Sequence, residues 1–258
     1  MRLATFNILH GRSLHDGTVD PDRLAEAVRR LDPDVLALQE VDRDQPRSHL
    51  ADLTAVAAEA MGALSYRFAA ALVGTPGRAW TAAGEDDLPG EAAYGIALLS
   101  RYPVTSWRVA QLPRIPFAFP YYRSQQRRVV RMVEEPRAVV TAHLDTPDGP
   151  LVVVSTHLSY VPGWGRTQLR QIRRSLVAVA DPVVLMGDLN LAGAAPARVT
   201  GFRPLAAHPT FPLGAPDRQI DHILARGPVG AVIGSAAPDL GLSDHRALVV
   251  ELAPRAAR

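Results

Sequence analysis

A carboxylate and a carboxamide stand two residues apart at the end of an apolar segment in the C-terminal half of the chain. Residues 182–186 are apolar and are followed by Gly187-Asp188-Leu189-Asn190. In an extended segment, residues i and i+2 face the same side, so Asp188 and Asn190 are placed to converge on one ligand. Burying such a polar pair costs free energy unless a metal, a water or a substrate satisfies it. The alternative is a strand that ends in an Asx turn and binds nothing.

Other polar side chains also stand where apolar, strand-like segments start or stop. With the first pair, they are Asn7, Glu40, His157, Asp188, Asn190, Asp221, Asp244 and His245. Capping or turn formation explains any one of them. Turn chemistry does not explain why so many coincide with strand ends, so we interpret them as one constellation.

The residue types in this constellation are those that phosphoester hydrolysis requires. Carboxylates and carboxamides without thiols suit a hard cation such as Mg²⁺ or Mn²⁺. Histidines beside carboxylates suit hydrogen-bond donation to a phosphoryl oxygen, because the carboxylate fixes the tautomer and the charge of the ring. An aspartate near that centre can take a proton from an attacking water. The sequence therefore predicts a metal, an activated nucleophile and groups that neutralise charge on the phosphoryl oxygens.

Strands dominate the elements that must position these residues. Apolar runs with β-branched residues or alternation predict strands over residues 3–8, 35–39, 66–72, 94–100, 104–111, 128–133, 138–145, 151–157, 183–186, 219–225, 230–236 and 246–252. Residues 146–150, Thr-Pro-Asp-Gly-Pro, predict a tight hairpin between two of them.

Three helices are predicted between the strands. The first begins at Asp20 as N-cap with Pro21 at N1 and runs to Pro33. The second opens at Ser48 and closes at Gly62, and the third covers 166–180, where its arginines read as a solvated face. Helices at intervals among long strand-only stretches favour a layered α/β sandwich, with two sheets inside and helices outside, over a Rossmann or TIM pattern.

Composition narrows the chemistry further. The 258 residues predict one domain spanning 1–258, with 47% hydrophobic and 21% charged residues and no linker signal. The absence of cysteine excludes thiolate metal sites and cysteine nucleophiles, and the absence of lysine excludes Schiff bases and P-loop lysines. The N-terminus reads directly as a strand, and no apolar run is long enough to span a bilayer. We therefore expect a cytoplasmic protein without stable membrane insertion, and a monomer.

Seven short motifs occur in an order that is typical of one superfamily. They are Thr5-Phe6-Asn7, Leu38-Gln39-Glu40, Leu99-Ser100-Arg101-Tyr102-Pro103, Ser155-Thr156-His157-Leu158, Gly187-Asp188-Leu189-Asn190, Ile220-Asp221-His222 and Ser243-Asp244-His245. From Asn7 to His245, the chain resembles the endonuclease/exonuclease/phosphatase superfamily with the DNase I-like fold. The resemblance implies a four-layer αββα sandwich of two packed, mostly antiparallel mixed β-sheets, with the site at one edge of the sheets.

The resemblance also implies a role for each motif residue. Glu40 resembles the principal metal carboxylate, with Asn7 and Asp244 nearby, and the expected ion is Mg²⁺ or Mn²⁺. Asp188 resembles the residue that orients or deprotonates water, and Asn190 resembles a phosphate or metal contact. His245, paired with Asp221, resembles the donor to the scissile phosphate. His157 resembles the second phosphate-facing histidine, and Tyr94 and Arg137 fall where supporting substrate-binding residues are often found.

The chain departs from this pattern near its N-terminus. The repair-nuclease branch often carries an acidic residue two positions after the Asn, where this chain has Leu9, so the usual acid for a second N-terminal metal ligand is missing. His10 either substitutes for that ligand, contacts substrate or has a structural turn role, and Asp16 remains an unassigned acid. His222 alternates with Asp221 and is predicted to face the opposite side of its strand. The remaining histidines read as surface or packing residues: His15, His49, His143 and His208.

The substrate is less sharply defined, because the superfamily includes DNA nucleases, inositol-phosphate phosphatases, sphingomyelinases and small phosphodiesterases. A net charge of +2 gives weak support to duplex-DNA binding. Residues 114–131 interleave arginines with aromatics, which suits base stacking or a lipid-headgroup pocket. The Ser-Thr-His-Leu motif resembles the phosphatase and phosphodiesterase branches. We therefore expect a small-molecule or headgroup phosphoester as substrate; the alternatives are a nuclease of the same fold and a non-catalytic binding module, in which some motif residues would be lost.

Overall fold

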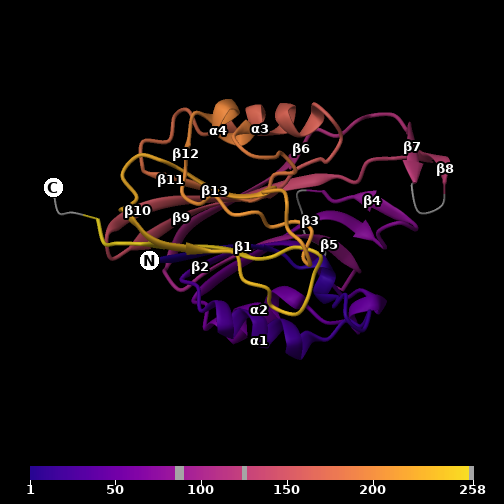
Figure 1. Cartoon of the computed structure of the whole chain (residues 1–258), viewed down its shortest axis with the longest axis horizontal. Coiled ribbons are helices and arrows are strands. Elements are labelled where there is room, and N and C mark those ends of the chain that lie inside the picture. The colour runs from indigo at the N-terminus through magenta and orange to yellow at the C-terminus, as the bar shows by residue number, and fades with distance from the viewer. Residues whose placement is uncertain (85–89, 124–126, 256–258) are drawn as a thin grey trace.

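Two β-sheets pack face to face, and helices cover the outer face of each (Figure 1). The computed structural model describes residues 1–84, 90–123 and 127–255. The first sheet has the order β14 (Val232–Ala236), β15 (Leu248–Leu252), β1 (Arg2–Asn7), β2 (Val35–Arg43), β5 (Ala93–Ser100), β3 (Ser65–Gly74) and β4 (Trp80–Ala82). The second has the order β12 (Arg203–Pro204), β13 (Asp221–Arg226), β11 (Val183–Asp188), β10 (Gly149–His157), β9 (Arg137–Thr146) and β6 (Val104–Leu112).

Strand pairing within the sheets is mostly antiparallel. β1 pairs with β2 and β10 with β11 in parallel, and the other pairs of neighbouring strands are antiparallel. Apolar side chains fill the space between the sheets and the space under each helical layer. The predicted αββα sandwich of two mixed, mostly antiparallel sheets is confirmed.

The helices begin and end where local capping chemistry places them. In α1 (Pro21–Leu31), the Asp20 carboxylate accepts from the Asp22 amide, as predicted for this N-cap. The prediction that Ser48 opens the second helix is wrong: α2 (Leu53–Met61) is capped by Asp52, whose carboxylate accepts from two amides of its first turn. Ser48 lies in a 3₁₀ turn, η2 (Pro46–Ser48), and the positive φ angles at the two residues after it separate this turn from α2.

The second helical layer differs from prediction at its ends. α3 (Trp164–Ser175) starts two residues earlier and ends five residues earlier than 166–180. The short α4 (Ala195–Thr200) was not predicted, since six residues hold too few apolar positions to show a helical period. Figure 1 shows α3 and α4 together over the second sheet, while α1 and α2 cover the first.

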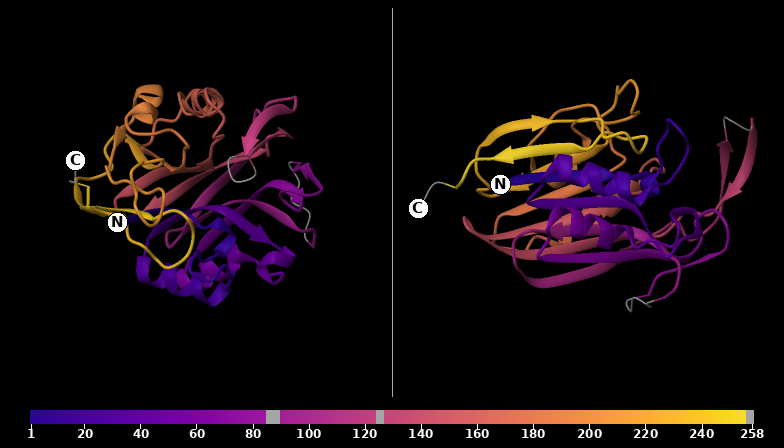
Figure 2. Two further views of the ribbon diagram at one scale, coloured as in Figure 1. Left: turned by 45° about the vertical axis from the view of Figure 1, so that its right-hand side comes forward. Right: turned by 90° about the horizontal axis from the view of Figure 1, so that it is seen from below.

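All predicted strands form, and the hairpin over 146–150 joins β9 to β10. Three short strands were not predicted: β4, β7 (Phe119–Arg123) and β12. β7 pairs with β8 (Arg128–Met132), and this hairpin stands out from the sandwich (Figure 2). The sequence patterns of the segments 74–91 and 113–126 also predict two long loops, but β4 and β7 form within them; residues 85–89 and 124–126 lie outside the described part of the chain. Another 3₁₀ element, η1 (Leu9–Gly11), follows β1. Among the described residues, no helix combines the length and apolar character needed to cross a bilayer.

Candidate active site

Strand alternation places four of the predicted residues between the two sheets. In β10, β11 and β13, the side chains of Val153, Met186 and Ile223 enter the core between the sheets. On each of these strands, the predicted residue is an even number of positions from the core residue and therefore faces the same side. The predicted residues are His157, Asp188 and Asp221, respectively. Asn7 stands in the same relation to Leu3 on β1. The residues thus come from facing strands of two different sheets and meet at one edge of the sandwich.

Glu40 reaches this edge through a β-bulge and not through strand alternation. The sequence placed it directly after a strand, but β2 continues through Arg43. The pairing of β2 with β5 shifts register between Gln39 and Val41, and Glu40 has a left-handed φ of 57°. Strict alternation would have turned this side chain toward α1 and α2, where the neighbouring Leu38 packs. The β-bulge re-aims it to the sheet edge, a known use of bulges beside functional sites.

Asn7 links the carboxylates of the two sheets. Its amide Nδ2 donates to Oε1 of Glu40 and to Oδ2 of Asp188, each at 3.1 Å. Its Oδ1 accepts from the backbone amide of Leu9 at 3.2 Å. In this arrangement Asn7 supports the carboxylates as a hydrogen-bond donor, and its role as a direct metal ligand stays a prediction.

His245 is held in its charged form by Asp221. Its Nδ1 donates to Oδ2 of Asp221 at 2.9 Å, and Thr210 donates to the same oxygen at 2.6 Å. Burial acts to lower the pKa of His245, but the hydrogen bond and charge of Asp221, with the charges of Asp188 and Asp244, raise it to about 9. Its Nε2 lies 3.9 Å from the nearest oxygen of Asp188 and of Asp244, beyond hydrogen-bond distance, so its proton is available to a ligand.

His157 is neutral, and its tautomer is fixed by Arg137. Arg137 donates from Nη1 to Nδ1 of His157 at 3.1 Å, and a guanidinium has no acceptor to offer in return. Burial first, then the charges of Arg137 and His245, hold the pKa of His157 well below its usual range. The ring proton therefore stands on Nε2, which lies 3.4 Å from Oδ2 of Asp188.

Asp188 has the environment of a general base. Burial, with the charge of Asp221, raises its pKa to about 7, while His245 and the hydrogen bonds from Asn190 and Asn7 act to lower it. Its Oδ1 accepts from the backbone amide of Asn190 at 2.9 Å, which is an Asx turn. The side chain of Asn190 donates to the backbone oxygen of Leu158 at 3.0 Å. Asp188 and Asn190 therefore form an Asx turn and also lie in the same site.

The constellation lines a cleft of about 830 Å³, here called the sheet-edge cleft. Of the predicted residues, it is lined by Glu40, Tyr94, Arg137, His157, Asp188, Asn190, Asp244 and His245. Asn7 and Asp221 lie behind this surface and act through the residues they bond. Burial, with the charge of Glu40, holds the pKa of Tyr94 well above its ordinary value, so its hydroxyl keeps its proton.

Sequence reasoning missed several residues of the cleft wall. The charged and aromatic ones are Arg47, Glu135, Tyr160, Phe211 and Arg218. His10 also lines the cleft, from η1 with a left-handed φ of 48°; the sequence had left it open between a turn role, a metal ligand and a substrate contact. Arg47 forms a bidentate pair with the buried Asp42, and no motif marked either residue. Phe211 packs against the ring of His245 with centroids 4.9 Å apart, which no local pattern could show.

The other acids and histidines lie outside the cleft. Asp16 pairs with Arg23 in an exposed loop, with Oδ2 and Nη2 2.8 Å apart. His222 faces away from Asp221, as predicted, and its Nε2 donates to the backbone oxygen of Leu191 at 2.8 Å. His49 and His208 bond a backbone oxygen and a serine hydroxyl, in keeping with their surface or packing role.

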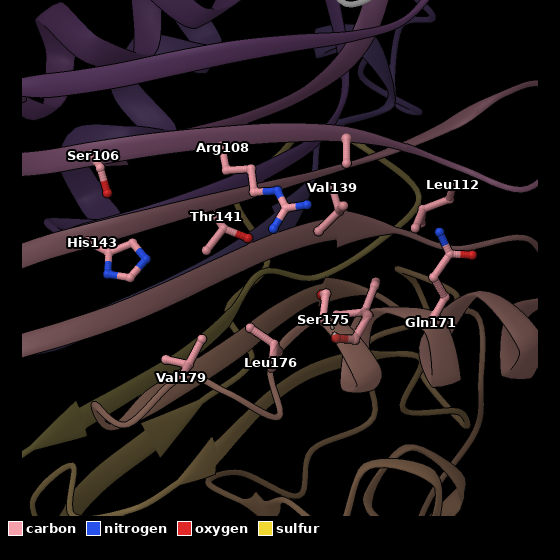
Figure 3. A pocket seen from close by; sticks show the side chains of 12 residues that line it. Ser106, Arg108, Leu112, Val139, Thr141, His143, Gln171, Ser175, Leu176 and Val179 are labelled. Carbon is pink, nitrogen blue, oxygen red and sulfur yellow. Dashed lines mark hydrogen bonds between the residues drawn. The ribbon is translucent and has the colours of Figure 1, made fainter.

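A second hollow, of about 300 Å³, lies on the outer face of the second sheet and contains none of these residues. Figure 3 shows Arg108, Thr141 and His143 of β6 and β9 facing Gln171 and Ser175 of α3. Its lining residues are half aliphatic and half polar or basic, and none of them is a carboxylate. It therefore lacks the groups that phosphoester chemistry needs.

The residues present fit a divalent cation. Burial, with the nearby charge of Asp244, raises the pKa of Glu40, and both carboxylates line the cleft. A second group, Asp188, Asp221 and His245, offers ligand atoms within 4.8 Å of one another. In that group, however, Asp221 and His245 already bond each other. Glu40 and Asp244 are therefore the better candidates, and oxygen ligands suit Mg²⁺ or Mn²⁺.

An αββα sandwich with acids and histidines at one sheet edge is the arrangement expected of the superfamily that the sequence motifs resemble. The model of the Endonuclease/Exonuclease/phosphatase family matches residues 4–245. The chain belongs to this family, whose members are generally phosphoester hydrolases. No curated protein matches at a significant level.

Solved structures show the same fold. An endonuclease/exonuclease/phosphatase from Beutenbergia cavernae is 25% identical, with a TM-score of 0.70 over 97% of this chain and 70% of that chain. A mannosyl-6-phosphatase from Bacteroides thetaiotaomicron is 16% identical, with a TM-score of 0.61 over 98% of this chain and 99% of that chain. Sphingomyelinase C from Streptomyces griseocarneus is 16% identical, with a TM-score of 0.55 over 97% and 98% of the respective chains.

Proposed function

We propose that this chain is a Mg²⁺- or Mn²⁺-dependent hydrolase of a small-molecule or headgroup phosphoester, acting by in-line attack of water. The observation that carries the proposal is a base and an acid side by side. The pKa of Asp188 is raised to about 7 and that of His245 to about 9. Between these values, Asp188 is ionised and His245 is protonated, and titratable groups pushed apart in this way are typical of acid–base sites.

Each residue then has a role that follows from its contacts. Asp188 takes a proton from the attacking water. Its carboxylate is held in place by Asn7, which donates to Oδ2, and by the backbone amide of Asn190, which donates to Oδ1. His245 donates its free Nε2 proton toward a phosphoryl oxygen, with Asp221 stabilising the charged ring.

The other side of the cleft contributes orientation and charge. His157 presents its Nε2 proton because Arg137 occupies Nδ1. Glu40 and Asp244 would hold the cation, which when bound polarises the phosphoryl oxygen and offsets the charge that develops on it. Tyr94, Asn190 and Arg137 are proposed substrate contacts, since all three line the cleft.

The size of the cleft supports a small ligand. A volume of about 830 Å³ lies within the range of small-molecule sites. Tyr160 and Phe211 add an aromatic wall beside the charged residues, which suits the organic part of a phosphoester. The names of the mannosyl-6-phosphatase and the sphingomyelinase C agree with this class, although at 16% identity they show the fold alone.

A nuclease is the second candidate, because the cleft continues into a basic hollow. This adjoining hollow, of about 570 Å³, shares Arg137 and Tyr160 with the cleft and adds Arg78, Arg131 and Trp80. Arginines with an aromatic ring suit a nucleic-acid strand. Of the aromatic residues in 114–131 that suit base stacking, several have side chains outside the described part of the structure.

A substrate panel tests the proposal. The full chain is assayed with Mg²⁺, Mn²⁺ or EDTA against bis-p-nitrophenyl phosphate, p-nitrophenyl phosphate, inositol phosphates, sphingomyelin and plasmid DNA. We expect metal-dependent turnover of a small ester or headgroup, lost in Asp188→Asn and kept in Asp239→Asn, a matched change of an exposed acid. Preferential cleavage of plasmid DNA would favour the nuclease, and turnover that survives Asp188→Asn would refute the site.

A further inference from the structure

The helical layer over the second sheet is strongly basic. Residues 149–180 and 189–216, which include α3 and α4, contain six arginines and no aspartate or glutamate. The whole chain nearly balances its charges, with 28 basic and 26 acidic residues. Local concentration of one sign in a nearly neutral protein marks a surface for ligands of the opposite sign.

Five of these arginines surround one hollow between the two helices. It has a volume of about 410 Å³ and is lined by Arg166, Arg170, Arg173, Arg174 and Arg198, with Ala195 and Val199. We call this set the arginine groove. The four arginines of α3 are spaced so that they share one helix face, and Arg198 approaches from α4.

None of the five guanidinium groups has an acidic partner among the described residues. All five residues are exposed, and within the described part of the chain neither a hydrogen bond nor an ion pair involves their side chains. The opposite layer differs, because Arg23 and Arg29 of α1 pair with Asp16 and Glu26. Like charges at i and i+4 destabilise a helix, so folding alone does not favour this arrangement.

We infer that the arginine groove is a non-catalytic binding site for a compact anion that carries two or more phosphate groups. Guanidinium groups form bidentate hydrogen bonds with phosphate oxygens, and five of them match a ligand of several negative charges. The groove shares no residue with the sheet-edge cleft, so the site is separate from the proposed catalytic one.

The shape of the groove favours a compact ligand over a larger partner. A flat bilayer would meet the rims of a hollow rather than all five of its arginines. A single nucleic-acid strand is normally held by aromatic stacking as well as by charge, and no aromatic side chain lines this hollow. An oligophosphate needs only the charges and hydrogen bonds that the arginines provide.

The test is calorimetric titration of the full chain with sodium tripolyphosphate in EDTA, which keeps the probe free of metal. We expect saturable binding that Arg170→Gln/Arg174→Gln weakens about tenfold or more, since two charge-assisted contacts are lost. The matched control is Arg30→Gln/Arg67→Gln, two exposed arginines on other elements, which is expected to bind within about twofold of wild type. His245→Ala is expected to keep the binding, because it changes only the cleft.

Four outcomes would overturn the inference. They are no binding at millimolar tripolyphosphate, binding that survives Arg170→Gln/Arg174→Gln, equal loss in the control pair, and loss only in His245→Ala. A single-stranded oligonucleotide or phosphatidylserine vesicles binding through these arginines, in place of tripolyphosphate, would also refute the compact ligand. Circular dichroism of each variant separates a lost site from a lost fold, and the exposed changes to glutamine are compatible with a helix.

Discussion

Replacing Asp221 by asparagine removes the charge that keeps His245 protonated while preserving its shape. Asp221 is fully buried and accepts hydrogen bonds from His245 and Thr210. Asparagine retains an acceptor oxygen for one of them. The pKa of His245, about 9 in the native protein, then loses its strongest upward influence.

The size of the effect follows from the remaining influences. In Asp221→Asn, burial still lowers the pKa of His245, and the charges of Asp188 and Asp244 still raise it. With these influences opposed, we use the ordinary histidine pKa of 6.5 for His245 in the variant. A fall from about 9 to 6.5 is worth about 3 kcal/mol of imidazolium stabilisation. At pH 8, the protonated fraction falls from about 90% to about 3%, whereas at pH 6 it changes by less than about twofold.

The expected result is a deficit in kcat that depends on pH. In a steady-state assay with the best small phosphoester, Asp221→Asn is expected to be about 30-fold slower than wild type at pH 8. At pH 6 it is expected to be no slower, because His245 stays mostly protonated and loss of the Asp221 charge favours the ionised form of Asp188. The pKa of Asp188 also responds to this change, because the charge of Asp221 raises it and that of His245 lowers it. At pH 8 both charges are lost and act on Asp188 in opposite directions, so the ratio of the two rates at that pH is set mainly by His245. A ratio that is constant across this range would refute the role of His245 as a proton donor. NMR titration of the His245 ring provides an independent reading of the same shift.

Three further predictions concern the rest of the cleft. Asp188→Asn is expected to lower kcat by about 10³-fold and to raise the free energy of unfolding at pH 8. Because the pKa of Asp188 is raised from 3.8 to about 7 in the folded protein, ionisation of Asp188 lowers the free energy of unfolding as pH rises through this range. Asparagine does not ionise and so does not have this cost. Denaturant unfolding of both proteins below and above this pH range checks the difference. Arg137→Gln is expected to raise the pKa of His157 toward its ordinary value, and NMR titration of the ring measures this. Glu40→Gln is expected to weaken Mg²⁺ or Mn²⁺ binding about tenfold or more in calorimetry, while Glu26→Gln, on the exposed face of α1, leaves it unchanged.

The sequence could predict the sheet-edge positions because strand alternation is a local rule. Once a strand is placed, the rule determines which face each side chain takes, and this correctly separated Asp221 from His222. The same rule fails at Glu40. A bulge inserts one residue relative to the partner strand, and nothing in Leu-Gln-Glu-Val-Asp distinguishes a bulge from a strand end.

Contacts between distant segments could not be predicted by any local rule. The tautomer of His157 depends on Arg137, twenty residues away, and the anchoring of Asp188 depends on Asn7, which is 181 residues away. The arginines of α3 were visible as a helical stripe and read as a solvated face. Arg198 turns that stripe into a groove, but it lies on α4, which is too short for its period to be recognised.

The two readings of Gly187-Asp188-Leu189-Asn190 describe one arrangement. The Asx turn engages Oδ1 of Asp188 with the Asn190 amide, which leaves Oδ2 directed toward Asn7 and the two histidines. A carboxylate whose first oxygen is fixed by its own turn loses little rotational freedom when its second oxygen binds a water or a proton. The turn is therefore part of the chemistry, because it orients the base before any ligand arrives.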